Sequence, residues 1–443
     1  MNKVFPVLIL FMLVCTLPAE AQQLSLASCI EIGLEQNYQI RMARNEQEVS
    51  DRNVSLGNAG YLPSLRLNAG LNGNNNHTEY DLRNGSTSKV NGSSTNSLSS
   101  NIALNYTLFN GFTVRTSYQR LKELQSVGEL NTRQAIESFI ANLAAQYYNV
   151  VRQKMLHDNL QYTLDLSRQR LNIVEARYEL GASSKLDVLQ AQVDFNKDSS
   201  RLVQQYETMK NAYISLNTML ANENLNTEIQ PVDTDILFND ALSYDDLLAR
   251  TMADNATLLI AKHRSQMSAL DLRLQEAQTY PTVSLTSQYG YSANLYNRKA
   301  SATNEKQQTL GLSYGATIGM NLYDGKNRRR QIQNARTTMA NQELSYRQSE
   351  QDVRSALLSE YMSYGNNRSL LSLALQNLET SRENYDTAME RYRLGELSGI
   401  ELREVQENLH NAEESVIDAK YQVKLAEISL LQLSATITQY MQP

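Results

Sequence analysis

Apolar residues near the C-terminal end of the chain recur at alternating intervals of three and four. This spacing forms one stripe on an α-helix and is typical of helices packed lengthwise in a coiled coil. The positions are Leu402, Val405, Leu409, Ala412, Val416, Ala419, Val423, Ala426, Leu430 and Leu433. Earlier segments repeat it, at Ile136, Ile140, Leu143, Tyr147 and Val150, and at Leu202, Tyr206, Met209, Tyr213, Leu216 and Leu220. The pattern predicts long helices that lie against one another.

One of these helices is expected to be very long. Residues 113–178 contain Gly128 and no proline, so little in their composition would end a helix. A continuous helix of this length spans about 100 Å. The whole sequence holds only 18 Gly and 6 Pro among 443 residues. That composition excludes a string of compact domains joined by many tight turns.

Between the helical stretches the apolar period falls to two. Residues 310–322 alternate apolar side chains with Gly, Ser, Thr and Asn, and residues 98–108 match them in the first half. Two more strands are predicted to begin at Pro63 and Pro281. Strands of about ten residues with one apolar face suit an outer-membrane barrel. A soluble sandwich edge is the alternative, but four strands alone would have nothing to pack on.

The ends of these strands carry the features of a membrane interface. Aromatic residues gather there, as in the girdles of membrane barrels: Tyr61, Tyr106, Phe109, Phe112, Tyr280 and Tyr323. The segments 72–97 and 292–308 are rich in Asn, Ser, Gly and Thr. We expect these two segments to be surface loops.

The chain contains two copies of one pattern. Residues 177–192 match residues 391–406 without a gap at an offset of 214, which indicates a duplicated unit. We predict a first repeat at 22–221 with a barrel hairpin near 62–109, a linker at 222–242, a second repeat at 243–435 with a hairpin near 281–323, and a tail at 436–443.

The N-terminal segment is predicted to be a secretory signal peptide over residues 1–21. The apolar run Val4–Leu17 follows Lys3, is too short to span a membrane, and precedes the A-x-A pattern at 19–21. The sequence Leu-Ala-Ser-Cys ending at Cys29 resembles a lipoprotein attachment site, but polar residues separate it from the apolar run. A cysteine facing the helix interior is the preferred interpretation.

Strand number predicts the oligomeric state. Backbone that spans a membrane must be hydrogen-bonded within a closed barrel, and known barrels have at least about 8 strands. Four strands per chain therefore require several chains. Two copies would leave a barrel filled by side chains, whereas three give twelve strands and room for a channel, so we expect a homotrimer.

These features together resemble the TolC-like outer-membrane efflux family. The twinned R-Y-x-L-G-x-x-S motifs, which begin at Arg177 and Arg391, are the most specific part of the resemblance, and the segment 24–37 looks like the family's usual mature start. The resemblance implies a 12-stranded trimeric barrel on an α-helical tunnel in the Gram-negative outer membrane and periplasm. It implies, as partners, a periplasmic adaptor (membrane fusion) protein, an inner-membrane pump and outer-membrane lipid.

The twinned motif is predicted to form the end of a helical hairpin in each repeat. A glycine there suits the left-handed C-terminal position of a helix, and Ser183 or Ser184, and Ser398, can cap the next helix. By resemblance, the adaptor-contact tips are Leu180, Gly181, Ala182, Leu394, Gly395 and Glu396.

Three acidic residues follow these tips. Glu401 and Glu404 lie three apart on one helix face, and Asp187 is the match of Glu401 in the first repeat. By resemblance they correspond to an acidic ring that closes the periplasmic entrance. Rings of carboxylates select for cations and can be blocked by them. The alternative is a solvated helix face, because acids are common and favourable in a first turn.

Other motifs do not indicate chemistry. Residues 311–315 match G-x-S-x-G but lie within an alternating strand, where the required strand-to-helix turn is missing. His77, Glu79 and Asp81 occur in a segment without a second ligand cluster. A basic cluster at 326–330 follows the last strand and suits interfacial anchoring. We therefore expect no catalytic or metal site and no cofactor.

The net charge of the chain is −6, so it lacks the overall basic excess that is typical of nucleic-acid-binding proteins. The leading hypothesis is the exit duct of a tripartite efflux system that passes small molecules from the periplasm to the exterior. An outlet for type I protein secretion or for metal-cation efflux stays open, because a duct has no tight substrate pocket. A soluble periplasmic coiled-coil scaffold is a weaker alternative, and an enzyme is not expected.

Overall fold

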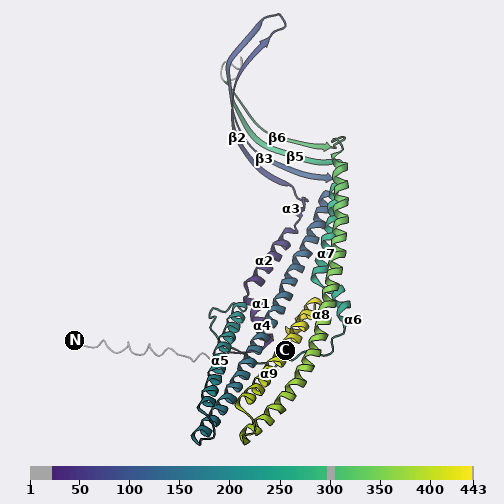
Figure 1. Ribbon diagram of the computed structural model, residues 1–443. Coiled ribbons are helices and arrows are strands. Elements are labelled where there is room, and N and C mark those ends of the chain that lie inside the picture. Colours follow the sequence, from purple (N-terminus) through teal and green to yellow (C-terminus); the bar gives the residue numbers. More distant parts are fainter. Residues whose placement is uncertain (1–21, 297–304, 442–443) are drawn as a thin grey trace, which may run out of the picture. The chain divides into compact units, whose positions relative to one another are not determined.

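The computed structural model describes residues 22–296 and 305–441 (Figure 1). The predicted signal peptide at 1–21 lies outside the described residues, as do 297–304 in the second predicted loop and 442–443 in the predicted tail. The chain forms two compact units. One unit comprises Met1–Glu46, Leu130–Leu259 and Gln348–Pro443, and the other comprises Gln47–Glu129 and Ile260–Arg347.

The second unit carries a curved four-stranded antiparallel sheet (Figure 1). Its order is β2 (Ser64–Asp81), β3 (Thr87–Asn110), β5 (Thr282–Tyr296) and β6 (Lys306–Gly319). The two hairpins meet where β3 pairs with β5, for example at Ile102 opposite Tyr289. The sheet thus joins one hairpin from each repeat in a single hydrogen-bonded layer.

One face of this sheet presents large apolar side chains to the surroundings. Leu65, Leu67 and Leu71 on β2 are exposed, and so are their counterparts on β6, Leu310, Leu312, Tyr314 and Ile318. The alternating residues on β6 are small or polar, which agrees with the predicted period of two. An exposed apolar surface of this extent is typical of a face that contacts lipid.

The predicted loop at 72–97 is wrong for most of its length. Strands β2 and β3 continue past it and stay paired up to Asp81 opposite Thr87, so only 82–86 form the turn. Its Asn, Ser and Thr residues suggested a loop, but backbone pairing does not require apolar side chains when the strands are solvated. In Figure 1 this hairpin extends beyond the other two strands. In the second hairpin, β5 continues to Tyr296 and β6 begins at Lys306.

Two helical hairpins dominate the chain. Helix α4 (Thr113–Glu179) is followed by α5 (Lys185–Met219), and α8 (Asn327–Leu394) is followed by α9 (Gly399–Leu433). Seven of the ten predicted coiled-coil positions on α9 are buried, and the other three are half-buried. The predicted lengthwise packing is therefore confirmed. No described helix contains an apolar stretch long enough to cross a bilayer.

Shorter elements complete each repeat. The first repeat adds β1 (Gln22–Leu24), α1 (Leu26–Gln36), α2 (Tyr38–Asn53) and α3 (Leu56–Ala59), and the later chain adds β4 (Ile229–Pro231), α6 (Tyr244–Asp254), α7 (Ala256–Ala277) and η1 (Ile437–Met441). Strands β1 and β4 pair in parallel, which the sequence did not indicate. Cys29 lies in α1 and is fully buried in the core, where burial raises the pKa of its thiol to about 12.

The duplication is visible in individual hydrogen bonds. The Asn37 side-chain amide donates to the Met219 carbonyl at 2.9 Å, and the Asn255 amide donates to the Leu433 carbonyl at the same distance. Each asparagine stands between two short helices and holds the end of the long returning helix of its own repeat. Two repeats with the same internal contacts explain why each supplies one strand hairpin and one helical hairpin.

Candidate functional site: the ends of the helical hairpins

Both helical hairpins turn through a glycine in the left-handed region. Gly181 has φ of 73° and Gly395 has φ of 83°, a conformation that glycine adopts without steric cost. The next residue donates its amide to a carbonyl five residues back, Ala182 to Arg177 at 2.8 Å and Glu396 to Arg391 at 2.9 Å. These bonds complete Schellman motifs, so the predicted helix ends are confirmed at both turns.

A capping box starts the returning helix in each hairpin. The Ser184 hydroxyl accepts from the amide of Asp187 at 3.2 Å, and the Ser398 hydroxyl accepts from the amide of Glu401 at 3.2 Å. In return, each carboxylate accepts from the amide of its serine at 2.9 Å. The hydrogen bond from the Ser184 amide lowers the pKa of Asp187, and the hydroxyl of Ser398 lowers that of Glu401.

These contacts bear directly on the predicted gate. Asp187 and Glu401 have a local role, because their carboxylates satisfy amide groups at the start of a helix. Glu404 lies three residues after Glu401 on α9 and is exposed. Within the described part of the chain, Glu404 forms no ion pair or hydrogen bond. Of the three predicted gate residues, Glu404 is thus the one whose carboxylate is uncommitted.

The six predicted contact residues at the tips are all exposed. Leu180 is 84% exposed and Leu394 is 75% exposed, although both are large apolar residues. Ile400 and Leu186, on the first turns of the returning helices, are exposed as well. Apolar side chains clustered at the surface in this way are typical of a protein-contact surface.

Arg177 joins the two hairpins near their ends. Its guanidinium lies over the ring of Tyr392 at 4.7 Å from the ring centre, and it donates to the carbonyls of Tyr392 and Arg393. A cavity of about 300 Å³ opens beside this contact and is lined by Arg170, Ala182, Asp187, Leu397, Ser398, Ile400 and their neighbours. The two turns of the twinned motif therefore form one continuous surface.

A buried polar network, about one to five turns from the tips, was missed at the sequence level. Arg403 on α9 pairs in bidentate fashion with Asp198 on α5, at 2.6 and 2.7 Å, and also contacts Glu407 at 2.6 Å. Asp198 is fully buried and accepts from the hydroxyl of Ser167 on α4. Arg201 completes the network through Glu407, at 3.0 Å.

Opposing effects act on the pKa values of this network. Burial alone would raise the pKa of Glu407, but the hydrogen bond from Arg201 and the charge of Arg403 outweigh it, so the pKa is lowered. Burial would lower the pKa of the Arg403 guanidinium. The hydrogen bond and the negative charge of Asp198 outweigh this effect, so the pKa of Arg403 is raised above its usual value. The network therefore ties α4, α5 and α9 together through hydrogen bonds and ion pairs.

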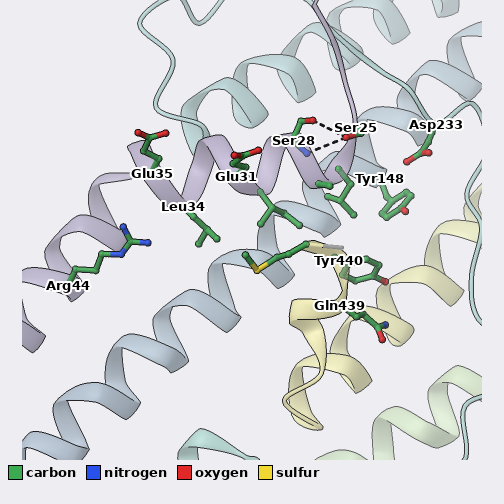
Figure 2. Close-up of a pocket in the computed structure, with 14 residues that line it drawn as sticks. Ser25, Ser28, Glu31, Leu34, Glu35, Arg44, Tyr148, Asp233, Gln439 and Tyr440 are labelled. Carbon is green, nitrogen blue, oxygen red and sulfur yellow. Dashed lines mark hydrogen bonds between the residues drawn. The ribbon is translucent and has the colours of Figure 1, made fainter. Parts of the chain in front are cut away.

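A second cavity, of about 990 Å³, lies beside α1 in the same unit (Figure 2). Glu31 and Glu35 follow α1 along it, and Tyr148 and Tyr440 stand at its other side. Ser25 and Ser28 on its wall are engaged in the start of α1, where the Ser28 amide donates to the Ser25 hydroxyl at 3.2 Å. The cavity does not pair a nucleophile with a base among its lining residues.

Comparison with known proteins identifies the family. The family model described as "Outer membrane efflux protein" matches residues 30–222 and 247–436. The chain belongs to the outer membrane efflux protein family. It is 21% identical to the outer membrane protein TolC of Vibrio cholerae over 437 residues, which cover 94% of this chain and 91% of TolC.

Other comparisons agree with this membership. The chain is 18% identical over 402 residues to the outer membrane efflux protein BepC of Brucella suis, covering 91% of this chain and 83% of BepC. It has the fold of the outer membrane channel CmeC of Campylobacter jejuni, with a TM-score of 0.74 at 15% identity, covering 93% of this chain and 85% of CmeC.

Several predictions are settled by family membership. This efflux protein is an outer-membrane channel of a Gram-negative bacterium, as expected, and its mostly helical fold with a membrane sheet is confirmed. Its relatives are described as outer membrane proteins and as an outer membrane channel. The soluble scaffold is therefore wrong. The roles of the tip and gate residues stay predictions.

The other sequence motifs lie in ordinary structural settings in this efflux protein. Residues 311–315 form part of β6, and Glu79 on β2 pairs with Lys89 at 2.8 Å. Among the described residues, no three His, Cys, Asp or Glu side chains come together as a metal site would require.

Proposed function

We propose that this outer membrane efflux protein is the homotrimeric exit duct of a tripartite system that passes small molecules outward, without catalytic chemistry of its own. The hairpin tips would contact a periplasmic adaptor protein, which in turn would meet an inner-membrane pump. Leu180 and Leu394, exposed together on the surface that Arg177 joins, are the observation that carries the docking role.

The trimer is supported by the edges of the sheet. In the described chain, β2 and β6 each pair on one side only. A membrane barrel leaves no such edge open, because unsatisfied backbone groups in lipid cost several kcal/mol each. Three copies supply twelve strands when β6 of one chain pairs with β2 of the next. Twelve strands exceed the roughly 8 that side chains alone fill.

Tip docking is tested by export. In cells lacking this chain, the wild-type gene should restore efflux of a fluorescent dye, while Leu394→Asp should restore less than about a tenth of it, because a charge would have to be desolvated at the contact. Leu237→Asp is the matched control, since Leu237 is equally exposed at 75% but lies in the linker between repeats. Equal export by both variants, at equal membrane levels, would refute tip docking.

The cargo class is addressed with the same strains. A panel of dyes, bile salts, antibiotics and metal cations distinguishes a small-molecule duct from a cation outlet. The level of secreted protein in the medium distinguishes both from an outlet for protein secretion. The family description names efflux, which favours a duct for small molecules or cations over an outlet for protein secretion.

A further inference from the structure

We propose that a basic cavity beside the end of β6 binds the phosphodiester of a membrane phospholipid. The cavity has a volume of about 460 Å³. Its walls are the turn after α7, the segment after β6 and the first turns of α8. The lining residues that carry the argument are Thr279, Tyr323, Lys326, Arg329, Ile332 and Arg336.

The cavity lies where the chain leaves the membrane. The exposed apolar residues of β6 are followed by Leu322 and Tyr323, which are 86% and 78% exposed. Helix α8 begins five residues after Leu322, at Asn327, and has no stretch that could cross a bilayer. A polar cavity at this boundary stands at the depth of the lipid head groups, where aromatic and basic side chains concentrate.

The cavity carries an excess of positive charge. Four basic residues line it against one acid, Asp324. Arg328 is committed, since its amide and Nε donate to Asp324 at 2.8 and 3.4 Å and its Nη1 donates to the Gln278 carbonyl at 3.1 Å. Arg336 pairs with Glu276 at 3.2 Å on the surface.

Two cations remain for a ligand. Within the described residues, Lys326 and Arg329 have neither an ion pair nor a side-chain hydrogen bond, and both are exposed. Arginine is well suited to phosphate, because its planar N–H groups match two phosphate oxygens, and lysine adds a mobile point charge. An anion with phosphate geometry would neutralise the remaining charge.

Comparison of the two repeats shows that the fold does not require this cavity. In the first repeat, Tyr61 and Tyr118 pack edge to face with ring centres 6.1 Å apart. At the repeat offsets, Tyr61 corresponds to Thr279 and Tyr118 corresponds to Ile332, so the aromatic pair is replaced by two smaller residues. The space that the rings fill in the first repeat is open in the second.

The turn that precedes α8, and its counterpart before α4, show the same contrast between the repeats. Phe112 and Lys326 are matched residues, and both adopt left-handed backbone, with φ of 70° and 66°. Phe112 packs against the rings of Phe109 and Tyr280, at 5.3 and 6.1 Å between ring centres. Because the same backbone position carries an aromatic ring in one repeat and a cation in the other, the basic site is a feature of the second repeat's sequence.

The mixed character of the walls favours a lipid over free phosphate. Leu322, Tyr323 and Ile332 line the same cavity as Lys326 and Arg329, so apolar and basic groups share its walls. A phospholipid presents its phosphodiester beside its acyl chains, so one molecule would contact both kinds of group at once. Free phosphate would leave the apolar groups in contact with water.

The test is native mass spectrometry of the full-length protein, extracted as its native oligomer and stripped of lipid. Phosphatidylglycerol is added in detergent, alone or with equimolar inorganic phosphate. The charge variant combines Lys326→Asn, Arg329→Gln and Arg336→Gln, where asparagine tolerates the left-handed backbone. The fill-in variant combines Thr279→Tyr and Ile332→Tyr, and keeps every charge. The control removes the exposed Arg347, Arg354 and Arg382 of α8.

Both site variants should bind phosphatidylglycerol about tenfold more weakly than wild type, a change of about 1.4 kcal/mol, and the control should bind like wild type. Inorganic phosphate should not displace the lipid. Unchanged lipid binding in the charge and fill-in variants would overturn the proposal. Full displacement by inorganic phosphate would also overturn it, because the site would then be one for a free anion. Neither result bears on tip docking.

Discussion

At the scale of single residues, Arg403 and Asp198 decide how the hairpins hold together. The pair is almost completely enclosed, with side-chain exposures of 12% and 0%. A buried pair adds little net stability when formed, because desolvation offsets the attraction, but removal of one partner leaves a buried charge without compensation. The pair therefore fixes which faces of α5 and α9 meet, and breaking it should be costly.

Arg403→Met should lower the free energy of unfolding of the helical unit by about 3–5 kcal/mol. Chemical denaturation followed by circular dichroism measures the change. Arg354→Met is the control, since Arg354 and Glu350 form an i,i+4 pair in which both side chains are solvated, with exposures of 55% and 36%, and the pair should contribute at most about 1 kcal/mol. Recovery of stability on adding Asp198→Asn to Arg403→Met is also expected. Equal effects of the Arg403 and Arg354 variants would contradict this account.

The gate is likewise a question about one residue. Glu401→Ala would remove both an acid and a helix cap, so its effect on a channel would be ambiguous. Glu404→Gln removes only the charge. We expect it to raise single-channel conductance in planar bilayers about twofold or more and to relieve block by divalent cations, because rings of carboxylates bind them.

Ser398→Ala serves as the matched control for the gate, because it weakens the cap by about 1 kcal/mol and removes no acid. Its conductance and divalent block should stay at wild-type values. If Glu404→Gln behaves like Ser398→Ala, the acidic-ring assignment of Glu404 is lost, and the acids after the turn serve only the helix.

At this scale the sequence was informative where local rules apply. The glycine turns and the serine caps follow from backbone geometry, and both were predicted at the correct residues. The network of Arg403, Asp198 and Glu407 could not be predicted. Its members flank the apolar stripe, and their meeting depends on how three helices are rotated about their axes, which the spacing of apolar residues leaves open.

At the scale of elements, the sheet shows what alternation can and cannot predict. The period of two is present in β6, where Leu312 and Ser313 lie on opposite faces of the sheet, and contact of the Leu312 face with lipid stays a prediction. The extent of the first hairpin was missed, because polar strands outside a bilayer carry no apolar signature. Asparagine-rich composition then resembles that of a loop.

Leu312→Arg should impair assembly of the barrel, because a charge near the middle of the bilayer costs about 2–4 kcal/mol on the lipid side. Ser313→Arg, one residue later, should be tolerated, since it faces the other side of the sheet. The fraction of heat-resistant folded protein in outer membranes measures both. Equal loss in the two variants would show that the assignment of the two faces is wrong.

At the scale of the whole molecule, duplication explains why the chain has two hairpins of each kind and few turns. Each repeat supplies one strand hairpin and one helical hairpin, and the asparagine contacts at Asn37 and Asn255 repeat with it. The low Gly and Pro content follows, because helices of 67 and 68 residues leave few places for turns. In the described residues the sheet is open at β2 and β6, and under the proposed trimer neighbouring copies of the chain supply the matching edges.

The mass of the protein extracted from outer membranes in mild detergent tests this central claim most directly. Light scattering with a correction for bound detergent should give three chains per particle, and heating in denaturing detergent should reduce the particle to single chains. A particle of one or two chains, or recovery of the protein without detergent, would contradict the trimeric membrane channel.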